Sequence, residues 1–276
     1  MTFLFLFSIL FFLFSILLLY LQLIKQDIEY IQQDIEIQTM TYIETGDEQT
    51  HRLSFYLAME EYIARHLLHQ DDCFFMWQVE PSVIFGRNQV PQNEVNIEYC
   101  IEHGIQTYRR KSGGGCVYAD QSNVMLSYIT PDANVTDTFS RYMRMVADTL
   151  QEIGIDAHPN DHNDIMIGDR KVSGNAIYRL PGSIIAHGTL LYDTDMEHMM
   201  HAITPSRQKL DRHGVESVRQ RICLLKDYTP LPFADIRAKI RQHLCQTTYT
   251  LTEHDREKVR EIELEYLDPQ FIGIAD

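Results

Sequence analysis

The sequence predicts an α+β fold built on a mixed or antiparallel β-sheet. Short apolar runs that end at turn residues outnumber helix-length segments in the middle of the 276-residue chain. Several runs follow one another directly, without the crossover helices that a doubly wound parallel sheet requires. No internal repeat or low-complexity linker interrupts the sequence after residue 40. We therefore expect an apolar N-terminal extension at 1–39, a folded domain at 40–250 and a helical tail at 251–276.

The first half of the expected domain combines strands with short helices. Residues 41–45 predict a strand, and the apolar spacing at 52–69 predicts an amphipathic helix. The runs CFFMWQ and SVIFG predict two more strands. Asn96 is suited to cap a short helix that Gly104 ends.

The second half begins with a strand that runs into a glycine-rich loop. A long helix is expected from Thr136 or Asp137 to about residue 153. Residues 163–179 predict a hairpin that turns at Gly168, and the segment after residue 193 is expected to be mostly helical. Further strands are predicted at residues 105–110, 117–120, 123–130 and 183–193.

The composition excludes several classes of protein. An apolar fraction of 45% with 23% charged residues is ordinary for a globular protein and excludes global disorder. The formal net charge of −15 argues against a general nucleic-acid binder, because binding to phosphates needs a basic surface. The 5 cysteines form no CxxC pair, which excludes a disulfide scaffold or a zinc ribbon and suits a reducing compartment.

The N-terminal segment differs from the rest of the chain. Residues 3–24 carry no charge, and as a helix they are long enough to span a bilayer of roughly 30 Å. They lack the basic start and the cleavage site of a secretory signal. The segment is either a membrane anchor or absent from the mature protein, with translation starting at Met40. We favour the second interpretation, and with it a cytoplasmic protein, because nothing downstream suggests a membrane neighbour.

The first candidate site is the run RRKSGGG at residues 109–115. Adjacent glycines let the backbone turn so that its N–H groups point together at an anion, and the basic side chains add charge. The run is not a Walker loop, because the GxxxxGK[ST] spacing is missing. The alternative is a flexible hairpin loop beside a solvated basic run.

Three further positions could carry chemistry. Lys171 lies among small residues of the expected hairpin, where its ammonium could neutralise a phosphate or carboxylate; the alternative is an exposed hairpin lysine. His187, before Gly188 and Thr189 in an apolar strand, is by itself more often structural than catalytic. Cys116 would need a nearby base to act as a nucleophile, and we favour a small packed thiol.

In their order along the chain, these segments resemble the lipoate–protein ligase family. The resemblance is carried by RRKSGGGCVYAD, NDIMIGDRKVSGNA, HGTLLYD and KLDRHGVESVRQR, together with FGRNQ at 85–89, and covers roughly residues 50–226. It implies the fold shared by biotin and lipoate ligases, a mixed β-sheet packed with helices. It also implies activation of lipoate by ATP and Mg²⁺ to lipoyl-AMP, followed by transfer to a lysine of a lipoyl domain.

The resemblance also implies roles for individual residues. Lys171 would be the catalytic residue that contacts the lipoyl carbonyl and the α-phosphate. Asn163 and Asp164 would hold the adenylate, and Asp164 its magnesium ion. The other positions around the acyl and nucleotide pocket would be Arg110, Ser112, Gly113, Gly114, Gly115, Cys116, Val117, Tyr118, Ser173, Gly174, His187, Gly188 and Thr189.

The implied acceptors are lipoyl-domain proteins, namely the E2 subunits of 2-oxoacid dehydrogenases and the H-protein of glycine cleavage. Three departures from the family pattern bear on this expectation. Ser122 stands where the family has Gly, Cys116 stands where it has Ala or Gly, and the chain ends at Asp276 without the accessory domain of the larger bacterial ligases. We therefore include a helper subunit among the expected partners, and a membrane only if residues 3–24 are retained.

Alternatives within and outside this family stay open. An octanoyl- or lipoyl-transferase of the same fold would act without ATP through a cysteine thioester, for which Cys116 is the candidate. A biotin ligase ranks lower, because RRKSGGG with HGTLL suits lipoate better. A non-catalytic, membrane-tethered binder of lipoate or adenylate would need residues 3–24, and the presence of Lys171 and three glycines argues against it.

Overall fold

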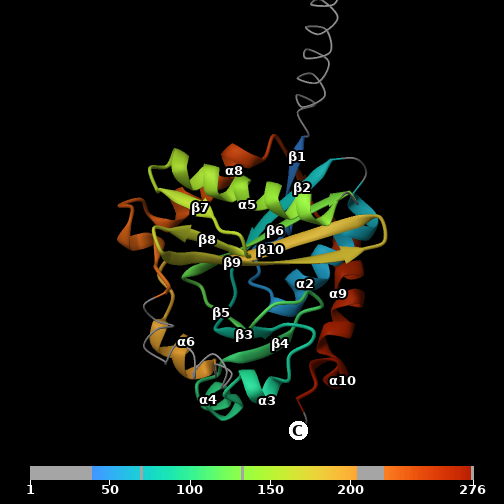
Figure 1. The fold of residues 1–276 in the computed structure, drawn as a ribbon. Helices are drawn as coiled ribbons and strands as arrows, with labels where there is room; N and C mark the ends of the chain where they lie inside the picture. The colour runs from blue at the N-terminus through green and yellow to red at the C-terminus, as the bar shows by residue number, and fades with distance from the viewer. Residues whose placement is uncertain (1–38, 69–70, 132–133, 204–220, 275–276) are drawn as a thin grey trace, which may run out of the picture. The chain divides into compact units, whose positions relative to one another are not determined.

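The structure, a computed structural model, describes residues 39–68, 71–131, 134–203 and 221–274 (Figure 1). These residues belong to one unit, Thr39–Asp276. The apolar segment 3–24 and most of the KLDRHGVESVRQR segment lie outside the described residues. Among the residues that are described, no helix is both long enough and apolar enough to cross a membrane.

The larger sheet is mixed, as the sequence predicts. Its described strands are β1 (Met40–Glu44), β2 (Asp72–Trp77), β6 (Asn123–Pro131), β7 (Ala157–Pro159), β8 (Asp164–Ile167), β9 (Arg170–Leu180), β10 (Ser183–Leu191) and β11 (Thr247–Thr250). They run in the order β11-β1-β2-β6-β10-β9-β8-β7. β1 pairs in parallel with β2 and β11, whereas the pairs from β2 to β7 are antiparallel. The α+β fold class is therefore confirmed.

Helices cover both faces of this sheet, because successive side chains of a strand point to opposite faces. The covering helices are α2 (Leu53–Tyr62), α5 (Val135–Glu152), α8 (Phe233–Leu244) and α9 (Glu253–Leu267). Phe74 and Met76 of β2 belong to the core beneath α5 and α8. Cys73, Phe75 and Trp77 of the same strand belong to the core beneath α2 and α9. In Figure 1, α5 and α8 lie above the sheet and α2 lies below it.

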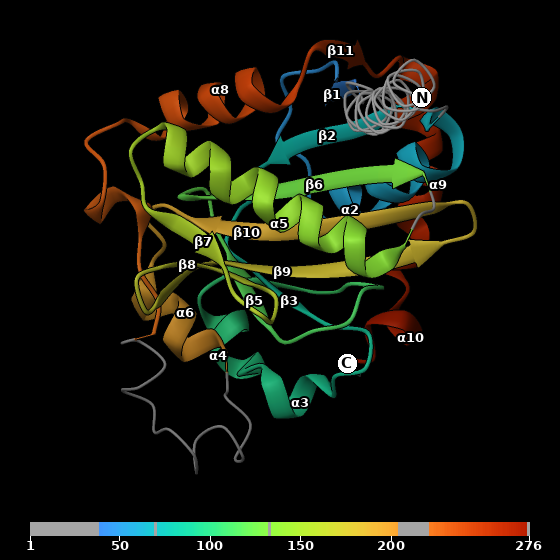
Figure 2. The ribbon, with the colours of Figure 1, turned by 45° about the horizontal axis from the view of Figure 1, so that its top comes forward.

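A smaller sheet carries the glycine loop. It consists of β4 (Gln106–Arg109), β3 (Ser82–Phe85) and β5 (Val117–Ala119) in that order, with β3 parallel to β4 and antiparallel to β5. The loop 110–116 joins the two outer strands, so pairing with β3 fixes both of its ends. Figures 1 and 2 both show this sheet beneath β9 and β10. The short elements are a π-helix (Ile63–Leu67), α3 (Pro91–Glu94), α4 (Ile97–Glu102), α6 (Met196–Ala202), a 3₁₀ turn (Leu225–Asp227) and α10 (Pro269–Ile272).

Three details differ from the sequence-based expectation. All ten residues of α2 are buried, so this helix has no solvent-facing side and is not amphipathic. The face that does not pack on the sheet is covered by α9. β7 and β11 are additional strands; all four residues of β11 are exposed, so no apolar alternation marks it. Helix α5 begins at Val135, because the Asn134 side chain accepts hydrogen bonds from the backbone N–H groups of Thr136 and Asp137.

Candidate functional site

A cavity of about 220 Å³ lies between the glycine loop, the β8–β9 hairpin and β10. It brings together most of the residues that the sequence suggests. Those that line it are Arg110, Gly114, Gly115, Cys116, Val117, Asn163, Asp164, Lys171, Gly174, His187, Gly188 and Thr189. Ser112, Gly113, Tyr118 and Ser173 do not line the cavity. The lining residues that were not singled out individually from the sequence are Leu57, Trp77, Ile84, Met125, Asn175 and Ala176.

Arg110 holds the glycine loop in its folded form. Its Nη2 donates to the carbonyl oxygens of Gly113 and Gly115 at 2.7 and 2.6 Å, and its Nη1 donates to the carbonyl oxygen of Ile84 at 3.1 Å. Its Nε donates to Ser112 Oγ at 3.0 Å. Burial lowers the pKa of this guanidinium to about 10. Most of its N–H groups therefore bind the loop itself, which leaves few of them for a ligand.

The basic side chains on either side of Arg110 are also bound within the protein. Arg109 donates to the carbonyl oxygens of Arg87 and Gln89 at 2.8 and 3.0 Å. Lys111 forms ion pairs with two carboxylates. The basic side chains of the run 109–111 are therefore not the solvated basic run that the sequence offers as one of its two interpretations.

His187 belongs to a buried hydrogen-bonded chain that starts at Arg110. Arg110 Nε donates to Ser112 Oγ, and the same hydroxyl lies 2.7 Å from Nε2 of His187. Nδ1 of His187 then donates to Glu60 Oε2 at 2.9 Å. Glu60 also accepts from Ser127 Oγ at 2.5 Å. The chain connects the glycine loop through β10 to α2.

Lys171 and Asp164 form the charged pair of the cavity. Lys171 Nζ lies 2.7 Å from Asp164 Oδ1, and the side chains are 37% and 29% exposed. A Cβ atom at Gly174 would lie only 2.6 Å from Lys171 Nζ, so a larger residue there would displace the end of the lysine side chain. Both charged groups remain accessible to a ligand.

Asn175 fixes the strand beside this pair. Its Nδ2 donates to the carbonyl oxygen of Asn163 at 3.0 Å, and its Oδ1 accepts from the hydroxyl of Tyr142 at 3.1 Å. A Cβ atom at Gly188 would overlap Asn175 Oδ1. Gly188 therefore allows this amide to lie flat between β9 and β10.

Cys116 lies in the cavity wall as an un-ionised thiol. Burial raises its pKa to about 12, and the nearby charge of Arg110 offsets only part of this effect. Such a thiol is a weak nucleophile at neutral pH.

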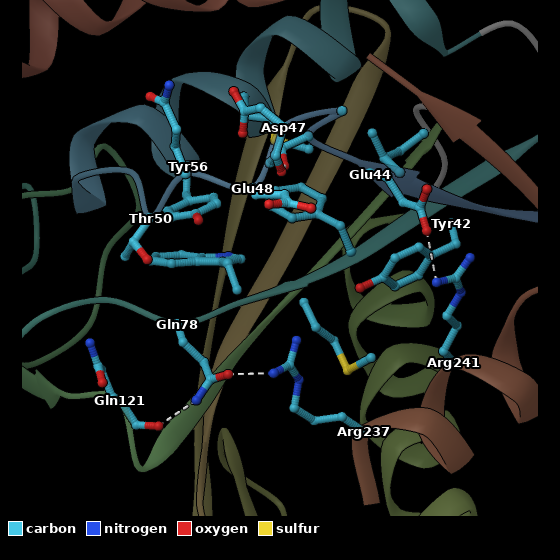
Figure 3. A pocket seen from close by; sticks show the side chains of 18 residues that line it. Tyr42, Glu44, Asp47, Glu48, Thr50, Tyr56, Gln78, Gln121, Arg237 and Arg241 are labelled. Carbon is cyan, nitrogen blue, oxygen red and sulfur yellow. Dashed lines mark hydrogen bonds and ion pairs between the residues drawn. The ribbon is translucent and has the colours of Figure 1, made fainter. Parts of the chain in front are cut away.

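A second cavity, of about 770 Å³, lies between β1, the loop after it and α8 (Figure 3). Glu44, Arg237 and Arg241 are among its lining residues, and none of the residues suggested by the sequence lines it. Trp77 lines both cavities, and its ring stacks on Tyr56 with 4.9 Å between the ring centroids. Trp77 is therefore part of the wall between the two spaces.

Comparison with known proteins assigns the family. Residues 53–245 match the family model of the lipoyl protein ligase A/B catalytic domain. The chain is 33% identical over 219 residues to lipoate-protein ligase LplJ of Bacillus subtilis and 33% identical over 213 residues to lipoate–protein ligase 1 of Staphylococcus aureus. These alignments cover 76% and 75% of this chain but 66% and 65% of the relatives, so the chain spans about two thirds of their length.

Solved structures share the fold. A bipartite lipoate–protein ligase of Thermoplasma acidophilum superposes with a TM-score of 0.75 at 24% identity, over 87% of this chain and 98% of that one. A lipoate-protein ligase A with bound ATP superposes with a TM-score of 0.72 at 24% identity, over 86% and 99%. The chain belongs to the lipoyl protein ligase A/B catalytic domain family.

Proposed function

We propose that this protein activates lipoate with ATP to lipoyl-AMP and transfers the lipoyl group to a lysine of a lipoyl domain. The observation that carries the proposal is the partly exposed Lys171–Asp164 pair, which faces the same cavity as the glycine loop. The named relatives, lipoate–protein ligases at 33% identity, support the same activity.

The cavity suits an acid with an apolar tail because its lining combines polar and apolar side chains. Lys171, Asp164 and Asn163 lie among its polar lining, whereas Trp77 and Met125 are among the apolar side chains. The apolar part excludes water from a hydrocarbon or dithiolane tail. The polar part receives the carboxylate and the nucleotide.

The first half-reaction joins two anions. An oxygen of the lipoate carboxylate attacks the α-phosphorus of ATP, and the bond to the pyrophosphate oxygen breaks. The ammonium of Lys171 neutralises the negative charge that both reactants bring, and fixed positioning supplies the rest of the rate enhancement. In the second half-reaction the neutral amine of the acceptor lysine attacks the lipoyl carbonyl carbon, and AMP leaves.

Asp164 is the residue that would hold magnesium. Among the described residues, no group of three or more His, Cys, Asp or Glu is arranged to hold a metal ion. One carboxylate fits magnesium nevertheless, because this ion is usually held by one or two carboxylates together with substrate phosphates. Bound there, magnesium would neutralise charge on the pyrophosphate leaving group.

The transferase alternative is less favoured. It needs a cysteine thiolate to form the thioester, and burial raises the pKa of Cys116 to about 12.

We extend the proposal to partners. The expected acceptors are E2 subunits of 2-oxoacid dehydrogenases and the glycine cleavage H-protein. The Thermoplasma ligase is described as bipartite and was studied with its E2 lipoyl domain, which supports both an E2 acceptor and a helper subunit for this chain.

The test of the proposed activation step is lipoate-dependent release of pyrophosphate from ATP by the full chain, without an acceptor. We expect one equivalent of pyrophosphate and of enzyme-bound lipoyl-AMP per active site. If neither forms, while an acylated carrier protein donates its acyl group to an acceptor, the chain is a transferase and the proposal is wrong.

Replacing Trp77 with valine is expected to widen the range of acids. The smaller side chain would join the cavities of about 220 and 770 Å³, so that a tail with a bulky end group fits. We expect kcat/KM for 8-phenyloctanoate relative to lipoate to rise about tenfold or more. The free energy of unfolding should fall by about 3 kcal/mol, because a large buried side chain is lost.

Tyr56→Phe is the matched control for this variant. Tyr56 lines only the larger of the two cavities, and phenylalanine keeps the ring that stacks on Trp77. The control should leave acid selectivity unchanged. A folded Trp77→Val protein with wild-type selectivity would show that Trp77 does not limit the acyl pocket.

A further inference from the structure

The basic run beside the glycine loop is tied to the C-terminal helices. Lys111, which lies between Arg110 and Ser112 in the chain, places its Nζ 2.7 Å from Glu61 Oε1 of α2 and 2.7 Å from Glu265 Oε2 of α9. The same ammonium lies 4.6 Å from the ring centroid of Tyr266. A side chain of the loop thus lies between two helices that are almost 200 residues apart in the sequence.

Glu61 is the buried centre of this arrangement. Its side chain has 0% exposure, and it accepts hydrogen bonds from Arg65 at 2.6 Å and from the Tyr266 hydroxyl. A fully buried carboxylate is stable only when its oxygens are paired; Arg65 pairs with Oε2, so Oε1 depends on Lys111 and Tyr266 for its partners. The pairing therefore holds Lys111 in one place.

The preceding residue of α2 holds the next residue of the loop. Glu60 accepts from His187 Nδ1, and Nε2 of His187 is hydrogen-bonded to Ser112 Oγ. Two adjacent carboxylates of one helix thus fix two adjacent loop residues, Lys111 directly and Ser112 through a histidine. Neighbouring residues on a helix point about 100° apart, which lets one carboxylate face β10 and the other α9.

The chain after α9 holds the residue on the other side of Arg110. Arg109 Nε donates to the carbonyl oxygen of Ile272 at 3.1 Å. Both neighbours of Arg110 are therefore bound to residues beyond 245, where the match to the family model ends.

We propose that Glu61 and Lys111, completed by Glu265 and Tyr266, form a clasp that positions the glycine loop for acyl binding. Through the clasp, the C-terminal helix α9 helps to hold the glycine loop in position. Lys111 acts through the loop and is a positioning residue, since it does not line the cavity. The effect on catalysis rests on the proposed ligase function, whereas the effect on the loop does not.

Lys111→Met tests the clasp, because methionine keeps the length of the side chain and removes its charge. We expect amide hydrogen exchange at residues 112–116 to become about tenfold faster in the ligand-free protein. We expect KM for lipoate to rise about tenfold, with kcat within about twofold of wild type. Lys111→Arg should restore both values, because its charge can still reach both carboxylates.

Lys258→Met is the matched control. Lys258 pairs with Glu261 on the same helix at 2.8 Å, but both side chains are largely exposed, at 43% and 63%. Loss of such a surface pair should change neither exchange at 112–116 nor KM.

Two results would overturn the inference. One is unchanged loop exchange and unchanged KM in folded Lys111→Met. The other is faster exchange throughout the protein together with a fall in kcat as large as the rise in KM, which would make Lys111 a residue of general stability. If the wild-type chain forms no lipoyl-AMP, the proposed function is wrong, and loop exchange alone still decides whether the clasp exists.

Discussion

Replacing Lys171 with alanine is expected to reduce lipoyl-AMP formation by about 10²–10³-fold, which abolishes it in an ordinary assay. Lys171 supplies an ammonium to the cavity, where two anions must meet. Its side chain is 37% exposed and pairs with Asp164, so its loss opens no core cavity. The thermal midpoint should therefore stay within a few degrees of wild type.

The measurement is lipoate-dependent pyrophosphate release, with the thermal midpoint recorded for the same samples. Lys226→Ala is the control, because Lys226 forms a comparable exposed pair with Asp193 and does not line the cavity. The control should keep wild-type activity. Unchanged adenylation by Lys171→Ala would rule out the role that we assign to this lysine.

Replacing Gly86 with alanine is expected to disable the site although Gly86 is not part of the glycine triplet. A Cβ atom at this position would overlap the carbonyl oxygen of Gly114, so the loop would have to move away from β3. The loop cannot do so freely, because the backbone N–H of Arg87 donates to the carbonyl oxygen of Ser112 at 3.0 Å. We expect kcat/KM for lipoate to fall about 10²-fold, since small displacements of positioning groups have effects of this size.

Gly113→Ala provides the contrast within the triplet itself. A Cβ atom at Gly113 would meet nothing within 4 Å, and this residue does not adopt a positive φ. Its kcat/KM should stay within about threefold of wild type, since the space for a methyl group is already present. Equal losses in the two variants, measured with lipoate and ATP, would mean that flexibility of the whole segment matters more than the close approach of Gly86 to Gly114.

Local patterns predicted the fold well where they were strong. The apolar runs that became β2, β3, β6 and β10 and the turn at Gly168 follow from residues close together in the chain. β11 was not predicted from the sequence because its four residues are polar and exposed, and only its pairing with β1 makes it a strand. The complete burial of α2 was not predicted because α9, the helix that covers it, is distant in the sequence.

Some residues of the candidate site could likewise be proposed from the sequence, whereas others could not. The glycine loop and the β8–β9 hairpin carry recognisable residues, so Lys171, Asp164 and Gly114 could be proposed from the sequence. Glu60 and Glu61 could not, because folding alone brings Glu60 to His187 and Glu61 to Lys111. A charge run such as 109–111 does not reveal by itself whether its partners are solvent, a ligand or the protein.

The most direct test of the proposed ligase uses the full chain with lipoate, Mg-ATP and an apo lipoyl domain, with the intact mass of the acceptor as the readout. We expect the acceptor to gain one lipoyl group per molecule, only when ATP is present, and Lys171→Ala to give no adduct. An acceptor that is modified from an acyl-carrier donor but never from lipoate and ATP would contradict the account and identify a transferase.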